Sequence, residues 1–124
     1  MIKALMLEFC NVKIYDNYMV VVMNEGVHIT PKHNIILVEI VETYYKNKPF
    51  VYITHRKNAY SVDPAVYFET SKIKNLVGFA IVAEIAVSKG NALIEKLFSE
   101  QPFEIFYDMN DAKKWAEHII ENKS

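Results

Sequence analysis

The sequence predicts an α/β domain with a mostly parallel, mixed sheet of four to five strands flanked by about four helices. Residues 18–23 are apolar at every position, and residues 50–54 and 76–83 are nearly so, which is typical of strands that helices cover on both faces. Segments with helical spacing of apolar residues separate and follow these runs. Such alternation indicates parallel strands joined by right-handed crossovers. A β-hairpin precedes it.

Composition bounds the function. A chain of 124 residues is expected to form a single domain, 1–124, that hides roughly two thirds of its surface on folding. The net charge of -1, from 14 basic and 15 acidic side chains, argues against a nucleic-acid partner. Cys10 is the only cysteine, so an intrachain disulfide and a cysteine-based zinc site are excluded. We expect Cys10 to be a buried strand residue.

The same features predict the location. Glu8 interrupts the apolar N-terminal residues, and no apolar window is long enough to cross a bilayer. We therefore expect a cytoplasmic protein with no transmembrane segment. The histidines show no paired metal-ligand spacing, and we expect neither a metal nor a cofactor.

The N-terminal elements follow from local patterns. Residues 3–10 predict a first strand at a sheet edge, and residues 12–15 alternate with a period of two. Asp16 and Asn17 tolerate positive φ, so they predict a two-residue hairpin turn before the strand at 18–23.

Proline marks the middle of the chain. Thr30 and Pro31 are an N-cap and a first helical residue, and they predict a helix that runs to about residue 47. Pro49 forces the preceding backbone out of the helix and begins the strand at 50–54. A shorter helix is predicted from Asp63 and Pro64 to about residue 75.

The last third of the chain repeats this order. Gly78 in the strand at 76–83 predicts the close approach of a helix. A helix follows between 88 and 100, then a strand at 103–107. The final helix is predicted to begin at Asn110 or Asp108. Its apolar stripe has spacings of i, i+3, i+4, i+7 and i+8 and consists of Ala112, Trp115, Ala116, Ile119 and Ile120.

The polar loop at 55–63 is the candidate site. It leaves the carboxyl end of the predicted central strand, where open α/β sheets place ligands and partners. Helix starts at Thr30, Asp63, Ser88 and Asn110 are predicted to gather at this edge and to favour an anion or an acidic partner segment. Arg56 is suited to binding a carboxylate or phosphate, although an ion pair with Asp63 is the simpler expectation. The candidate binding residues are His55, Arg56, Asn58, Tyr60, Ser61 and Asp63.

The chain resembles the STAS family of anti-sigma-factor antagonist domains, in particular its SpoIIAA-like branch, which is sometimes grouped with CRAL-TRIO lipid-transfer domains. The resemblance rests on the hairpin at 12–23, on the strand at 50–54 with its loop into the Asp63–Pro64 helix, and on the closing pattern at 102–106 and 110–115. It covers most of the chain. It implies a regulatory module with a protein partner, such as a kinase or a sigma-regulatory protein.

The resemblance also implies a modification site. Regulatory members of that family carry an Asp-Ser-Ser-Gly motif whose serine is phosphorylated, and the matching place here reads Tyr60-Ser61-Val62-Asp63-Pro64. One serine is retained and the glycine is not. A phosphate on Ser61 would lie near a helix N-terminus, but Asp63 would repel it. Local hydrogen bonding by Ser61 is the alternative interpretation.

Two further functions stay open. Six aromatic residues cluster around the central strand and its two flanking helices. They predict either an ordinary core or a pocket for a small apolar or amphipathic, lipid-like ligand. An exposed patch of them would instead form a homodimer surface. The six residues are Tyr44, Tyr45, Tyr52, Tyr60, Tyr67 and Phe68. Ser61, His55 and Asp63 have the residue types of a hydrolase triad but share one loop without an oxyanion hole. We expect an interaction module and not an enzyme.

Overall fold

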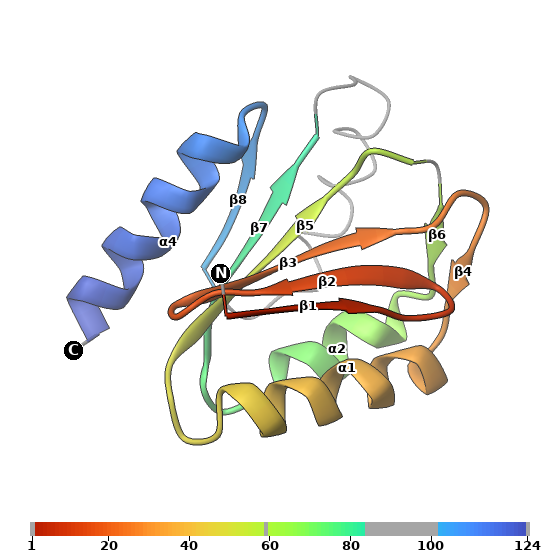
Figure 1. Cartoon of the computed structure of the whole chain (residues 1–124), viewed down its shortest axis with the longest axis horizontal. Coiled ribbons are helices and arrows are strands. Elements are labelled where there is room, and N and C mark those ends of the chain that lie inside the picture. The colour runs from red at the N-terminus through yellow and green to blue at the C-terminus, as the bar shows by residue number, and fades with distance from the viewer. Residues whose placement is uncertain (1, 59, 84–101, 124) are drawn as a thin grey trace.

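Six strands form the main sheet of the computed structural model, which describes residues 2–58, 60–83 and 102–123 (Figure 1). Their order across the sheet is β1 (Lys3–Met6), β2 (Cys10–Ile14), β3 (Tyr18–Met23), β5 (Phe50–His55), β7 (Leu76–Val82) and β8 (Phe103–Phe106). A second, two-stranded sheet pairs β4 (His28–Ile29) with β6 (Ser61–Val62). The described helices are α1 (Pro31–Tyr44), α2 (Ala65–Ser71) and α4 (Met109–Lys123).

The sheet is mixed, as predicted. β1, β2 and β3 pair antiparallel, whereas β3, β5, β7 and β8 pair parallel. β5 lies between β3 and β7. The prediction that the strand before the candidate loop is central is therefore confirmed.

The predicted total of four to five strands was too low, although the predicted strands at 3–10 and 12–15 correspond to β1 and β2. The first of them was predicted too long, because the chain turns between Met6 and Cys10, where the N–H of Leu7 donates to the carbonyl of Cys10 at 2.8 Å. The loose alternation of apolar residues gave no sign of this turn. The two-residue strands β4 and β6 were also missed, because each is too short to show a period.

The hairpin between β2 and β3 is formed at the predicted residues. The N–H of Tyr15 donates to the carbonyl of Tyr18 at 2.9 Å, which leaves Asp16 and Asn17 as the two loop residues. Neither of them has a positive φ; among the described residues that conformation occurs at Asn47 and Gly26. The turn was predicted correctly, although not by the backbone geometry expected of it.

Helices cover both faces of the sheet. α1 and α2 lie against one face and α4 lies against the other (Figure 1). β3 shows the consequence, because Met19 and Val21 belong to the core under α1 and α2, whereas Tyr18 and Val20 belong to the core under α4. The apolar run at 18–23 was therefore interpreted correctly.

The helix starts match the proline signals. Thr30 is the extended N-cap of α1, and its N–H donates to Nδ1 of His33 at 3.0 Å, so a histidine takes the place of the usual glutamate in a capping box. α1 ends at Tyr44 and not near residue 47. Pro64 has a helical backbone, and the N–H of Ala65 donates to Oδ1 of Asp63 at 3.0 Å.

α4 contacts β7 through the predicted stripe. Ala112 and Ala116 are completely buried. A Cβ atom at Gly78 would lie 3.2 Å from the side chains of both Trp115 and Ile119, so the glycine permits this close approach. Asp108 begins the helix, because its Oδ1 accepts the N–H of Asn110 at 3.0 Å.

The helix predicted between 88 and 100 lies outside the described residues. No helix within 2–58, 60–83 or 102–123 has the length and apolar character needed to span a bilayer.

Candidate functional site

The loop at 55–63 emerges at the carboxyl edge of the sheet. β6, near the end of the loop, pairs in parallel with β4, and the N–H of Asp63 donates to the carbonyl of Ile29 at 2.9 Å. The starts of α1 and α2 are therefore neighbours, as predicted. The strand ends also lie side by side, since Arg56 donates its N–H to Val82 and Ala83 donates to Phe106. The predicted helix start at Ser88 lies outside the described residues.

Arg56 does not stand at the mouth of the site. Only 5% of it is exposed, and its guanidinium carbon lies 4.9 Å from the centroid of the Tyr60 ring. Within the described part of the chain it forms no ion pair with Asp63, whose carboxylate accepts the N–H of Ala65 instead. Arg56 thus supports the loop from inside by a cation–π contact, while His55 is half-buried at the end of β5.

Asn58 and Tyr60 attach the loop to the sheet. Nδ2 of Asn58 donates to the carbonyl of Met23 at 2.9 Å, at the end of β3. The Tyr60 hydroxyl lies 3.2 Å from the Thr54 hydroxyl on β5. Both side chains are half-buried. These contacts fix the loop above the two central strands.

Ser61 is exposed, and its hydroxyl lies 2.7 Å from Nδ1 of His28. The sequence suggested His55 as its imidazole partner. His28 was missed because it belongs to β4, 33 residues away, and reaches Ser61 only through the pairing of β4 with β6. The carboxylate of Asp63 accepts the N–H of Ala65 at the start of α2. The side chain of Ser61 is therefore paired with His28 and not with Asp63. An exposed hydroxyl can accept a phosphate, which would here lie beside the imidazole of His28.

The aromatic residues around β5 pack as core where they are described. Tyr45 and Tyr52 are 1% and 7% exposed, and the ring of Tyr52 stacks on Phe79 with centroids 4.8 Å apart. Tyr44 and Tyr60 are half-buried. The cavity that Tyr52 and Tyr60 line under the helices has a volume of only about 20 Å³, enough for about one water molecule. The side chains of Tyr67 and Phe68 lie outside the described part.

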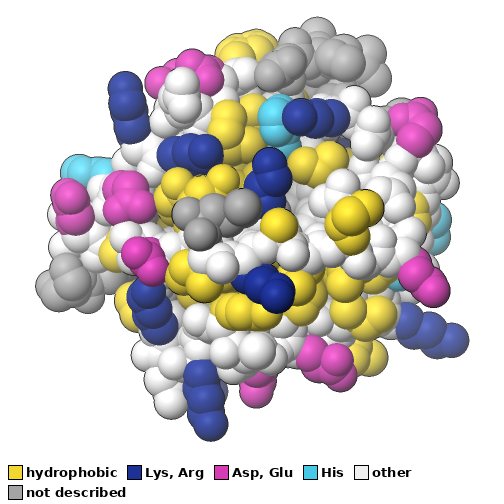
Figure 2. Space-filling view, in the orientation of Figure 1, with side chains coloured by type: hydrophobic (Ala, Val, Ile, Leu, Met, Phe, Trp, Pro, Cys, Tyr) yellow, Lys and Arg dark blue, Asp and Glu magenta, His cyan; other side chains and the backbone are white. Residues whose placement is uncertain are grey.

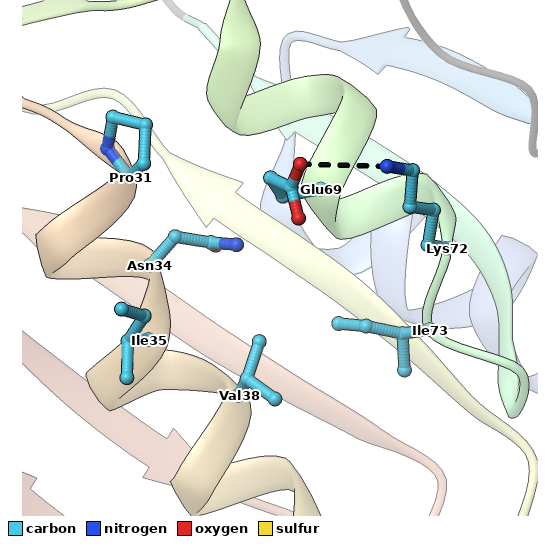
Figure 3. Close-up of a pocket in the computed structure, with 7 residues that line it drawn as sticks. All are labelled: Pro31, Asn34, Ile35, Val38, Glu69, Lys72 and Ile73. Atoms are coloured by element: carbon cyan, nitrogen blue, oxygen red, sulfur yellow. Dashed lines mark hydrogen bonds and ion pairs between the residues drawn. The ribbon is translucent and has the colours of Figure 1, made fainter.

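A groove of about 400 Å³ separates α1 from α2 on the outer side of the helices (Figure 3). Ile35 and Val38 of α1 face Ile73, and Lys72 pairs with Glu69 at 3.5 Å. Asn34 lines the groove and accepts a hydrogen bond from the Thr70 hydroxyl at 3.1 Å. The sequence did not predict this groove, because it depends on the distance between two helices.

The arrangement defines the class of fold. An N-terminal antiparallel hairpin leads into parallel strands, and the loop after the central strand enters a short helix. This is a SpoIIAA-like α/β fold, as the resemblance of the sequence implied.

A solved structure supports this assignment. The chain is similar to the crystal structure of an uncharacterized protein of the DUF3478 family with a SpoIIAA-like fold from Shewanella loihica PV-4. The TM-score is 0.59 at 14% sequence identity, over 86% of this chain and 91% of that one. No family model and no curated protein matches the sequence. At this identity the similarity shows the fold.

Proposed function

We propose that the protein is a non-enzymatic STAS-type regulatory module that binds a protein partner through the 55–63 loop and the beginning of α2. The observation that carries the proposal is the pairing of β4 with β6, which holds Ser61 exposed beside His28 at the carboxyl edge of the sheet. The contacts of the buried Arg56 and of the half-buried Asn58 and Tyr60 support the loop from below. A surface held in place in this way loses little conformational entropy on binding.

Ser61 is the proposed switch on this surface. Phosphorylation would add a charge of about −1.5 to −2 beside His28 and two residues from Asp63. The imidazole of His28 is within hydrogen-bond reach of this position, whereas the carboxylate of Asp63 would repel the added charge. The net result is a changed electrostatic surface at the centre of the proposed contact, which is how such a modification alters partner choice.

Affinity capture from the native cell extract tests the proposal. Wild-type protein and Ser61→Ala are expected to recover the same partner, Ser61→Asp to recover less, and Ser61→Arg combined with Ala65→Arg to recover none. Both positions are exposed, so thermal unfolding should be nearly unchanged. Arg56 is unsuitable for charge reversal, because a carboxylate would be buried there.

The matched control is Glu39→Arg, an exposed position on α1 away from the loop. This variant should recover the partner as the wild type does. Equal recovery by the double variant would contradict the proposal. A cytoplasmic location and a homodimer stay predictions.

A further inference from the structure

A small hollow lies on the face of the sheet that carries α4, beside the first turns of that helix. It has a volume of about 120 Å³ and lies between β2, β3, the end of β5 and the first turns of α4. Its lining includes Lys13, Lys57, Lys113 and His55. Figure 2 shows Lys, Arg and His side chains beside apolar ones in the upper part of the view.

The lysines of the hollow have no carboxylate partner among the residues that the structure describes. None of the described lining residues is acidic. Lys13 is paired across the sheet with Ala4 on β1 and Val20 on β3. In the part of the chain that the structure describes, neither Lys13 nor Lys57 forms an ion pair.

Lys113 is directed to the same place by its neighbours. Glu117, one helical turn further on, would be its usual partner, but Oε2 of Glu117 accepts a hydrogen bond from Asn17 at 2.8 Å. Nζ of Lys113 instead lies 5.1 Å from the centroid of the Tyr15 ring, which also lines the hollow. Three lysine side chains thus line one concave surface of a chain whose net charge is only -1.

The size and the charge indicate the ligand. The hollow is much smaller than the roughly 300–1,000 Å³ of sites that enclose drug-sized molecules, but it exceeds the space of one water. Three lysines exceed the charge of a carboxylate, and lysine commonly binds phosphate as a point charge. Val20 and Tyr15 add an apolar surface beside the cations.

We infer that this hollow binds the phosphate group of a small phosphomonoester, with the organic part of the ligand against Tyr15 and Val20. The site differs from the proposed partner surface, with which it shares only His55 and Lys57. A ligand here would contact the first residues of the 55–63 loop from the α4 side.

Calorimetry and NMR titration at low ionic strength test the inference, with inorganic phosphate and phenyl phosphate as probes. Saturable binding is expected, with shifts centred on the lining residues and tighter binding of phenyl phosphate. Lys13→Gln combined with Lys113→Gln should weaken binding by roughly tenfold or more, since the variant lacks two of the three cations that attract the phosphate. Glutamine keeps the first two methylene groups of each lysine, and Lys13 is exposed and Lys113 half-buried, so the fold should persist.

Lys114→Gln is the matched control, because Lys114 is an exposed neighbour on α4 that does not line the hollow. It should bind as the wild type does. Sedimentation with phosphatidylcholine vesicles that contain phosphatidic acid tests whether the phosphate belongs to a lipid headgroup. Sedimentation of the wild type but not of the double variant indicates a lipid headgroup. Binding of phenyl phosphate without sedimentation indicates a soluble phosphate ester. Equal binding by the wild type and the double variant would overturn the inference, as would absence of saturable binding to phosphate, phenyl phosphate and vesicles.

The phosphate-binding experiments do not test the proposed partner surface, since Ser61 and Ala65 are unchanged in the lysine variants. Loss of partner capture with intact phosphate binding, or the reverse, would separate the two proposals.

Discussion

Cys10 shows how burial alone sets the chemistry of a residue. It is completely buried in β2, and desolvation raises the pKa of its thiol from the ordinary value of 9.0 to about 12. The thiolate is the reactive form of cysteine. The prediction that Cys10 is a buried strand residue is therefore confirmed, and the thiol has no part in the proposed function.

The raised pKa predicts a pH dependence of stability. Below pH 9 the thiol is protonated in both the folded and the unfolded state, so the contribution of its burial to stability is fully present. Above pH 9 only the unfolded state loses the proton, until the pKa of the folded state, about 12, is reached. The free energy of unfolding should fall over this range, by up to about 4 kcal/mol from a shift of three pKa units. Urea unfolding at successive pH values measures it. Cys10→Ala should show a smaller fall, and an identical fall would contradict the assignment.

The packing of α4 on β7 depends on the absence of a side chain at Gly78. Gly78 leaves space for Trp115 and Ile119, both 3.2 Å from the position of a Cβ atom. Gly78→Val adds two further methyl groups at this contact, so we expect a loss of about 1–3 kcal/mol from overpacking. Urea unfolding checks the value.

Val77→Ala is a useful comparison, because the half-buried neighbour on the same strand loses volume instead of gaining it. The Gly78→Val protein with Trp115→Leu should recover part of the lost stability. No recovery would show that the loss arises in the strand itself and not in the contact with α4.

Tyr45 joins distant parts of the whole molecule. Its hydroxyl lies 2.6 Å from the carbonyl oxygens of both Tyr15 and Tyr18, so the end of α1 is attached to the turn between β2 and β3. Tyr45→Phe keeps the stacking on Phe50, whose ring centroid is 4.7 Å away, but leaves these buried carbonyls without that donor. We expect a loss of about 1–3 kcal/mol in urea unfolding.

Tyr44→Phe is the control, since the part of the chain that the structure describes offers its half-buried hydroxyl no hydrogen-bond partner. That variant should unfold close to the wild type. Equal stability of Tyr45→Phe and Tyr44→Phe would contradict the proposal that the Tyr45 hydroxyl attaches the end of α1 to the turn between β2 and β3.

Local signals along the chain determine most of the elements. The apolar run at 18–23, the Thr30–Pro31 pair and the stripe on the last helix each depend on residues within a few positions of one another. The central position of β5 followed from the alternation of strands and helices. These features could be predicted because hydrophobic periodicity and capping act over one or two turns of chain.

The side-chain contacts of the candidate site could be found only in the tertiary structure. The contact of Ser61 with His28, the burial of Arg56 and the gathering of Lys13, Lys57 and Lys113 all join segments that are far apart in the sequence. Side-chain direction decides each of them, and that direction depends on strand register and on how closely a helix approaches the sheet. Local patterns along the chain predict which strand carries the candidate loop, whereas tertiary packing decides which of the loop's side chains reach the solvent.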